Sequence, residues 1–419
     1  MQKIPLSESI KNSFATPGPA AFALIALWAS LMFSKALASI AVVFALIFWI
    51  IWRLKKNSWH LNLDRRTLGV LLSFFIWVCL SYFWSEAPKQ SLKGIQKTGE
   101  FILLFLLVSD VFQCPKALKK WELSFLVIAL IVAADGWFQY FTGKDLIRGF
   151  AVEHSGAGVR LSACLNTYGL FATYLISALP LLAGLTVRFC REKDIRLAVL
   201  SGLTFLSSLP LLYLTRSRGA ILAAVFGFFI FLISRRYFKH FIAALLITAA
   251  AVCVIPKNVL IHLDLEHKEQ SLVERFYLWD RAVHVVKAKP LTGTGINTYA
   301  VAHQKYDTTQ NWRVKNYYAH NGYLQTAAEI GIPGLFLFLM FLFNFFRNSL
   351  KGIKEWASSS HPATAMPLTG ITLGILNFLI LVMVDTILHN PPSIKLFWYL
   401  IAMAFAYMPV RSSKIKLEA

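Results

Sequence analysis

"LYLTRSRGAILAAVFGF", residues 212–228, places two arginines between two apolar blocks. Arg216 and Arg218 stand in a link of about four residues, with Thr215 and Ser217 beside them. The apolar blocks on both sides approach the length that crosses a hydrocarbon layer of about 30 Å. The stretch predicts two transmembrane helices joined by a tight turn. Guanidinium groups held there cost free energy unless they bind something, so the turn is a candidate functional element.

The rest of the chain repeats this pattern, with apolar blocks of about 15–24 residues. Of the 419 residues, 57% are hydrophobic and only 15% are charged, whereas about a quarter of the residues in soluble domains are charged. The composition indicates an all-α polytopic membrane protein with about twelve transmembrane helices. The predicted spans are residues 18–34, 36–52, 67–84, 99–113, 122–142, 164–187, 197–214, 219–234, 241–255, 330–346, 367–388 and 393–409.

The distribution of lysine and arginine orients these helices. With the N-terminus inside, the predicted inner segments hold 23 Lys and Arg residues, and the short outer loops hold nine. Cytoplasmic loops carry such an excess, so the formal net charge of +21 indicates a rim facing anionic lipid and not a nucleic-acid partner. With this orientation Arg216 and Arg218 lie on the outer side, although Lys and Arg are generally concentrated on the inner side.

One outer loop, residues 256–329, is far longer than a connection inside a compact bundle needs. Within it, "SLVERFYLWDRAVHVVKAKPLTGTG" (271–295) predicts an amphipathic helix that ends at a Lys-Pro pair and a glycine-rich turn. "HNGYLQTAAEIG" (320–331) predicts a second helix. We therefore expect transmembrane helices over 1–255, a loop subdomain over 256–329, and further transmembrane helices over 330–419.

Cationic side chains from separate outer segments could converge with an imidazole. The candidates are Arg160, Arg216, Arg218, Arg275 and His320. Guanidinium groups bind phosphate oxygens in a bidentate manner, and histidine can accept a proton from a sugar hydroxyl. The alternatives are that Arg216 reaches lipid phosphates, that Arg275 forms a surface ion pair, and that His320 is structural.

Other chemistry has little support in the sequence. No HExxH or GxSxG motif and no dense acidic cluster is present, and the five cysteines are scattered without a CxxC pair. "GTGINTYA" (293–300) lacks the GxGxxG spacing of a nucleotide-binding loop. We therefore predict no metal and no cofactor. Asp385, near the outer end of the eleventh span, could pair with an arginine of the site or cap a helix.

Four segments together resemble the O-antigen ligase family, which is grouped with the O-antigen polymerases. They are "LYLTRSRGAILAAVFGF" (212–228), "VRLSACLNTYGLFATYL" (159–175), "ERFYLWDRAVHVVKAKPLTGTGINTY" (274–299) and "AHNGYLQTAAEIGIPGLFLF" (319–338). The resemblance implies a GT-C-like glycosyltransferase of the bacterial inner membrane that uses neither metal nor ATP. The implied reaction transfers a glycan from undecaprenyl diphosphate to a sugar hydroxyl of the lipid A–core acceptor on the periplasmic face.

The same resemblance implies roles for individual residues. Arg218 and Arg275 would hold the diphosphate, supported by Arg160 and Arg216, and His320 would accept or position the hydroxyl proton. The secondary candidates, for orienting His320 or pairing with an arginine, are Asn321 and Glu329. An O-antigen polymerase or a protein O-oligosaccharyltransferase would share the donor. A transporter is a further alternative, but it predicts mid-membrane charges and an internal repeat, which we do not find.

Overall fold

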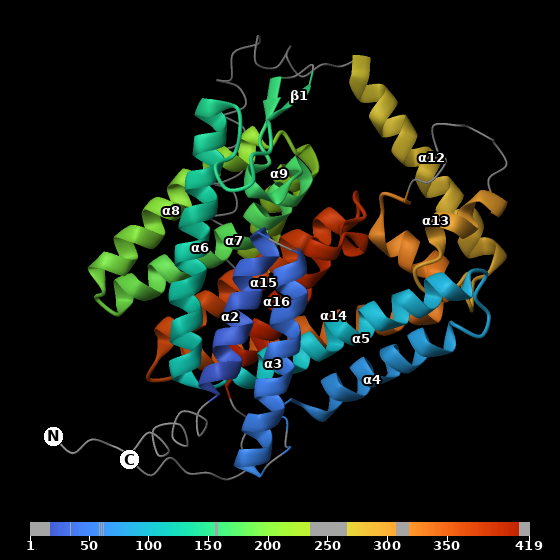
Figure 1. The fold of residues 1–419 in the computed structure, drawn as a ribbon. Helices are drawn as coiled ribbons and strands as arrows, with labels where there is room; N and C mark the ends of the chain where they lie inside the picture. Colours follow the sequence, from blue (N-terminus) through green and yellow to red (C-terminus); the bar gives the residue numbers. More distant parts are fainter. Residues whose placement is uncertain are drawn as a thin grey trace.

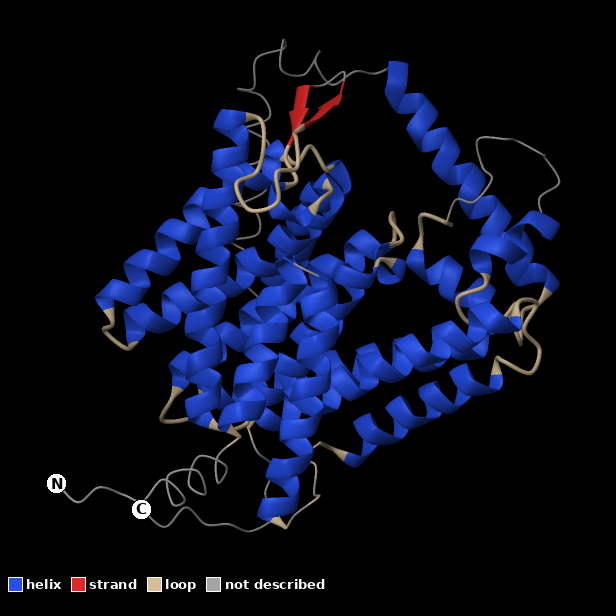
Figure 2. Ribbon diagram, in the orientation of Figure 1, coloured by secondary structure: helices blue, strands red, loops and turns tan. Residues whose placement is uncertain are grey.

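The computed structural model describes residues 17–33, 35–57, 59, 61, 63–155, 158–234, 266–306 and 318–409. Helices make up nearly all of this part, as Figure 2 shows. The α-helices are α2 (Gly18–Phe33), α3 (Lys35–Lys56), α4 (Arg65–Leu80), α5 (Pro88–Val111), α6 (Pro115–Thr142), α7 (Tyr168–Arg191), α8 (Ile195–Leu214), α9 (Arg218–Ser234), α12 (Glu266–Ala288), α13 (Tyr299–Ala302), α14 (Gly322–Ala357), α15 (Ala365–Val382) and α16 (Pro391–Tyr407).

Short elements connect some of these helices. They are the strands β1 (Glu153–Ser155) and β2 (Gly158–Arg160) and the 3-10 turns η1 (Ala163–Leu165), η2 (His303–Tyr306), η4 (Pro362–Thr364) and η5 (Ile387–His389). The antiparallel β1–β2 hairpin is the one departure from the predicted all-α class among the described residues. It lies at the end of the molecule where α6 finishes, at the top of Figure 1.

Each predicted span in the described residues coincides with a helix, and the ninth, 241–255, lies outside those residues. Within the described part of the chain, five helical segments are long and apolar enough to cross a membrane by length and composition: α6, α7, α8, α14, and α15 with its preceding turn. Two shorter apolar helical stretches, Gly18–Leu31 and Arg218–Ile230, accompany them. The chain is therefore a multi-pass helical membrane protein.

The connections between helices gather at two ends of the bundle. Two backbone hydrogen bonds join predicted outer segments: Leu161 N to Leu214 O (3.2 Å) and Glu86 N to Thr294 O (2.9 Å). Two side-chain contacts join predicted inner segments: Asn348 Nδ2 with Asp64 Oδ2 (2.8 Å), and the ion pair of Arg188 with Glu122. Contacts thus stay within each predicted side, which is the arrangement that alternating membrane crossings require.

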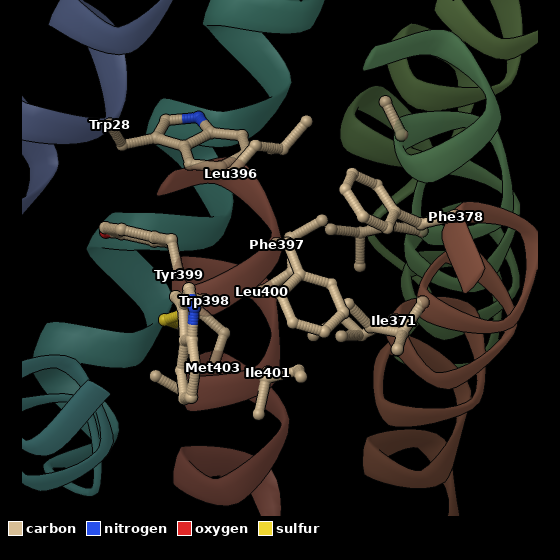
Figure 3. Close-up of a cluster of buried hydrophobic side chains, with 14 of the residues drawn as sticks. Trp28, Ile371, Phe378, Leu396, Phe397, Trp398, Tyr399, Leu400, Ile401 and Met403 are labelled. Atoms are coloured by element: carbon tan, nitrogen blue, oxygen red, sulfur yellow. The ribbon is translucent and has the colours of Figure 1, made fainter. Parts of the chain in front are cut away.

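α16 packs in the centre of the bundle. Its Tyr399 lies against Trp28 of α2, with ring centroids 5.0 Å apart, and its Phe397 stacks on Phe378 of α15 at 4.9 Å (Figure 3). The Tyr399 hydroxyl donates to Leu24 O at 3.1 Å. Offset and tilted ring pairs of this kind add to the packing energy beyond the buried area. The last helix therefore joins the first helices to α15.

α7 and α15 approach closely because glycine lies at their interface. A methyl group at Gly374 would lie 2.5 Å from Ser177 O, and Gly370 one turn earlier meets the backbone of Pro180. Gly370 and Gly374 form a GxxxG sequence, which lets two membrane helices bring their backbones together where lipid supplies no hydrophobic drive for association. This interface holds α15, whose C-terminal end borders the candidate site.

We expect Gly374→Ala to lower the unfolding free energy by about 1–3 kcal/mol, because the added methyl group overlaps a backbone atom that cannot move alone. Thermal unfolding of the protein purified in detergent measures the change. The matched control is Gly69→Ala in α4, where a methyl group meets nothing within 4 Å. That control should leave stability unchanged or raise it by up to about 1 kcal/mol. Equal effects of both substitutions would contradict the close α7–α15 contact.

Candidate active site

The turn between α8 and α9 presents the two arginines found in the sequence. Thr215 closes α8 and donates its hydroxyl to Leu212 O at 2.7 Å, while Ser217 N–H donates back to Thr215 Oγ1 at 3.2 Å. Arg216 takes a φ of +55°, in the left-handed region that side chains rarely adopt. This backbone conformation lets the chain reverse in three residues, so that Arg218 is the first residue of α9.

Arg160 and Arg216 are brought together by the β1–β2 hairpin. Leu161 N–H donates to Leu214 O at 3.2 Å, which fixes the end of β2 on the α8–α9 turn. Each guanidinium lies over an aromatic ring, that of Arg160 over Tyr168 at 4.6 Å and that of Arg216 over Tyr213 at 4.8 Å. Both Nε atoms are buried without a hydrogen-bond partner among the described residues. The rings hold the cations in place, and Arg216 Nη1 also donates to the Tyr213 hydroxyl at 3.1 Å.

Arg218 is exposed and has no acidic partner in the described part of the chain. A cation at the first residue of a helix is opposed by the helix dipole, so its position does not stabilise α9. The next residue, Gly219, lies against α15, where a methyl group would be 3.2 Å from Leu381 Cδ1 and 3.3 Å from Val384 Cγ2. The arginine turn therefore adjoins the segment that follows α15.

That segment carries Asp385, which faces His320. The Oδ1 atom of Asp385 lies 3.6 Å from His320 Nδ1, and both side chains are about one-third exposed. The carboxylate of Asp385 is held by the hydrogen bond that Thr386 N–H donates to Asp385 Oδ1 at 2.7 Å. Among the described residues, Asp385 takes neither of the two roles open from the sequence, pairing with an arginine and capping a helix. Asp385 instead lies where it can orient the imidazole and stabilise its protonated form.

His320 is fixed through its backbone. Its φ is +47°, and its carbonyl accepts a hydrogen bond from Trp279 Nε1 at 3.1 Å. Trp279 lies on α12, one turn after Arg275, so this bond ties the arginine-bearing helix to His320. Arg275 is half-buried and forms no ion pair with Glu274 or any other described acid. Figure 1 shows α12 running from the end that carries the hairpin down towards α13.

These contacts form one continuous path. It runs from β2 to the arginine turn, along α9 to the end of α15, from Asp385 to His320, and through Trp279 to the helix of Arg275. Segments widely separated in the sequence thus meet at the same end of the bundle. The path links the arginine turn, and the helix that carries Arg275, to the histidine–carboxylate pair.

The two secondary candidates have other partners. Asn321 is the N-cap of α14, and its side-chain oxygen accepts from Tyr323 N and Leu324 N, both at 3.0 Å. Glu329 is buried and accepts from Asn297 N at 2.6 Å, Tyr299 N at 3.3 Å and Gln325 Nε2 at 3.2 Å. Within the described residues, the ionisable group facing Glu329 is His389 at 3.6 Å, not an arginine. Both residues therefore shape the backbone around the site.

His389 was not singled out from the sequence. Its ring stacks on Tyr318 with centroids 6.0 Å apart, and its Nδ1 atom is buried without a hydrogen-bond partner in the described part. One signal could have found it: "HN" occurs twice on the outer side, at 320–321 before α14 and at 389–390 before α16. Two histidine–carboxylate pairs, His320–Asp385 and His389–Glu329, thus flank the connection between α15 and α16.

The loop subdomain is fastened to the α4–α5 connection through Glu86. Its carboxylate lies 2.8 Å from Lys289 Nζ and 2.9 Å from Lys305 Nζ, and it accepts from the Tyr306 hydroxyl at 2.7 Å. Burial raises the pKa of Glu86, but the hydrogen bonds from Lys289, Tyr306 and Lys305 outweigh burial and bring the pKa to about 2. The charged form of Glu86 therefore stabilises the folded subdomain.

We expect Glu86→Gln to lower the unfolding free energy by roughly 1–3 kcal/mol at pH 7, because two lysines lose their carboxylate. Since the folded pKa lies below the ordinary value of 4.5, the contribution is complete above pH 4.5 and is lost as pH falls from there through about 2. Thermal unfolding at pH 7 and pH 3 measures both effects. Glu153 is exposed, so Glu153→Gln is the control and should change neither the stability at pH 7 nor its pH dependence. If Glu86→Gln unfolded like the wild type, the stabilising role of the Glu86 ion pairs would be contradicted.

No group of three or more His, Cys, Asp or Glu side chains that could hold a metal ion occurs among the described residues. The polar groups gathered on the path are instead permanent cations, one imidazole and one carboxylate. Such groups bind anionic oxygens and transfer protons. The described side chains are therefore chemically suited to an anionic ligand.

A comparison with known protein families agrees with this class of site. Residues 203–339 match the model of the O-antigen ligase family. The matched segment contains the second half of α8, the arginine turn, α9, α12 and the start of α14, and with them Arg216, Arg218, Arg275 and His320. The predicted resemblance to the O-antigen ligase family is confirmed over residues 203–339, which contain three of the four motifs; the motif at 159–175 lies outside the match.

Three curated proteins are similar over most of the chain. The exopolysaccharide production protein ExoQ of Rhizobium meliloti is 24% identical over 299 residues, which cover 67% of this chain and 65% of ExoQ. Two proteins with "polysaccharide ligase" in their names are each 25% identical. The one from Rickettsia felis aligns over 71% of this chain and 72% of its own length, and the one from Rickettsia typhi over 66% and 67%. The chain thus spans somewhat less than two thirds of ExoQ.

Proposed function

We propose that the protein is an O-antigen ligase. It transfers a glycan from undecaprenyl diphosphate to a sugar hydroxyl of lipid A–core at the periplasmic face of the bacterial inner membrane. The observation that carries the proposal is the His320–Asp385 pair at the end of α15, adjoining the arginine turn and tied to α12. The family match and the names of the relatives support polysaccharide assembly as its setting.

In the proposed reaction the acceptor hydroxyl oxygen attacks the anomeric carbon of the donor sugar. The bond between that carbon and the diphosphate oxygen breaks, and the diphosphate leaves with the electron pair. His320 accepts the hydroxyl proton, and Asp385 stabilises the resulting imidazolium. Arg218 and Arg275 stabilise the charge that develops on the diphosphate, with Arg160 and Arg216 in support. Guanidinium groups remain charged throughout, so the mechanism proposed needs no metal and no nucleotide.

A second candidate is an O-antigen polymerase, which would use the same donor and add its glycan to another lipid-linked glycan. The similarity to ExoQ, named for exopolysaccharide production, favours keeping this candidate. The arginine path serves both reactions, because the leaving group is the same. The two functions differ in the acceptor alone.

One assay separates the candidates. The purified protein is incubated with undecaprenyl diphosphate-linked glycan and lipid A–core, in the presence of a chelator and without nucleotide. Glycan attached to lipid A–core is the result expected of a ligase, and a lengthened donor glycan would identify a polymerase. If correctly folded protein forms neither product, the glycosyltransferase proposal is refuted. A transporter is then the remaining alternative.

A further inference from the structure

A cavity of about 240 Å³ is bordered by His389 and Glu329, the second histidine–carboxylate pair. Its lining comes from α4, α5, α14, the turn before α16 and α16, together with residues 296–297 of the loop subdomain. Among the described residues, none of its walls belongs to α7, α8, α9 or α12, which carry or support the arginines. The cavity and the arginine turn are therefore separate regions that share the His320 neighbourhood.

Two helices each contribute one face to this cavity. α5 lines it with residues 94, 97, 98 and 101, with Glu100 beside them, and α16 lines it with residues 391, 394, 395 and 398. Both sets follow the i, i+3, i+4, i+7 spacing of a single helical face. On each helix the first and last residues are about 10 Å apart along the axis, so the cavity has a definite long direction.

Polarity changes along that direction. The end near the loop subdomain is polar, with Asn297, Glu329 and the buried, partnerless Nδ1 atom of His389. The deeper end is apolar and aromatic, lined by Phe74, Phe101, Phe338 and Trp398. A cavity that is polar at one end and apolar at the other fits an amphiphile better than a uniformly polar or apolar molecule.

Two lysines add positive charge. Lys395 is mostly buried and neutralised by Glu100, with Nζ and Oε1 2.6 Å apart. Lys97 is exposed and has no acidic partner among the described residues, so one cation remains unneutralised at the rim. It lies two residues before the fourth predicted span, at the level where lysine meets lipid head groups. The free charge favours a ligand with an anionic group.

The polar end of the cavity leads to the proposed reaction centre. His389 stacks on Tyr318, which lies two residues before His320. A ligand whose head lies beside His389 would extend past Tyr318 towards His320. The donor diphosphate is proposed to bind at the arginine turn, whose residues do not line the cavity. In a displacement at carbon, the attacking hydroxyl and the leaving group stand on opposite sides.

We infer that this cavity holds the lipid end of the acceptor, an anionic glycolipid anchored in the membrane. Its chain lies between α5 and α16, its phosphate or carboxylate meets Lys97, and its sugar reaches His320. The inference rests on the proposed function for the reaction and on the cavity alone for the binding. A binding assay that needs no catalysis therefore tests it separately.

The assay uses quenching of Trp398 fluorescence by phospholipids with brominated chains. The full-length protein in detergent is titrated with brominated phosphatidic acid, and Trp398→Phe isolates the signal of that residue. We expect Lys97→Glu to raise the half-saturating concentration roughly tenfold. The matched control is Lys93→Glu, an exposed lysine one turn away on α5 that does not line the cavity, and it should bind like the wild type. Brominated phosphatidylcholine should bind more weakly than phosphatidic acid.

Three results of this assay would overturn the inference: no quenching that depends on Trp398, equal effects of the two lysine substitutions, or equal binding of the two lipids.

Competition then identifies the natural occupant. Unlabelled lipid A should displace the brominated lipid, whereas displacement by undecaprenyl diphosphate alone would assign the cavity to the donor and refute the acceptor assignment. In the transfer assay, Lys97→Glu should raise the KM for acceptor and leave the KM for donor unchanged. Normal acceptor kinetics would refute the inference and leave the proposed function intact.

Discussion

The variant His320→Ala is expected to lose glycan transfer by a factor of about 10²–10⁴ while the protein still inserts and folds. The acceptor hydroxyl is a poor nucleophile while it keeps its proton, and His320 is the imidazole beside a carboxylate on the path that includes the arginine turn. Because the side chain is about one-third exposed and Asp385 lies 3.6 Å away, its removal leaves no large buried void. Transfer of labelled glycan by the purified variant measures the loss.

Two further variants make this result specific. Asp385→Asn keeps the shape of the partner but removes its charge, so transfer should fall by less than in His320→Ala. His284→Ala is the matched control, since His284 is an exposed histidine on α12 whose ring contacts Asp280 of the same helix. The control should transfer glycan at the wild-type rate. Normal transfer by His320→Ala would remove this residue from the mechanism.

Arg275→Ala and Arg218→Ala are each expected to reduce kcat/KM for the donor by about 10²–10³. Each removes a cation that would meet the diphosphate where charge develops as the donor bond breaks. Neither arginine has an acidic partner among the described residues, so its loss exposes no unpaired carboxylate. Kinetics at varied donor concentration measure the effect, and lysine at either position should restore only part of the rate, because an ammonium lacks the bidentate geometry.

The control for charge alone is Lys287→Ala, an exposed cation on the same helix as Arg275. It should leave the donor kinetics unchanged. If Arg275→Ala and Lys287→Ala behaved alike, the arginine would contribute only to the general positive field of the loop subdomain. Loss in Arg218→Ala with normal Arg275→Ala would confine the diphosphate to the α8–α9 turn.

The helices could largely be predicted from the sequence, because apolar runs report bilayer depth directly. Their ends could not. α5 begins at Pro88 although its apolar part was predicted to begin at 99, since the intervening polar residues continue the helix out of the hydrophobic layer. α14 begins at Gly322 and continues through a break at Ile330 and Gly331 into the predicted span at 330. The hydropathy pattern shows which part of a helix is apolar enough to lie in the membrane, but not where the helix begins and ends.

The β1–β2 hairpin shows a second limit of the sequence. Gly158, the first residue of β2, takes a φ of +107°, a conformation that favours glycine, and pairs with Ser155 of β1. The β1–β2 pairing places Arg160 next to Leu161, whose N–H donates to Leu214 O. Three-residue strands give almost no periodic signal, so the contact of Arg160 with the arginine turn could be expressed only as a possibility of convergence.

The sequence indicated which residue types form the candidate site, but not which side chains they contact. The arginines in the predicted outer segments, where Lys and Arg are otherwise few, indicated a site on the outer side. The histidine before a predicted helix indicated the same side. Asp385 could not be assigned to His320 from sequence, because the contact depends on how α15 and α14 pack. The backbone donors that Glu329 and Asn321 accept from could not be predicted either, because a motif shows neither the burial of a carboxylate nor the N-cap geometry of an asparagine.

The central claim is that Arg218, Arg275 and His320 form one outward-facing site for a lipid diphosphate. Single cysteines at these three positions, in a chain whose native cysteines are replaced by serine, test it directly with a membrane-impermeant maleimide added to intact spheroplasts. The account predicts labelling of all three from outside and protection of all three by undecaprenyl diphosphate. Labelling only after the membrane is permeabilised, or labelling that undecaprenyl diphosphate does not slow, would contradict it.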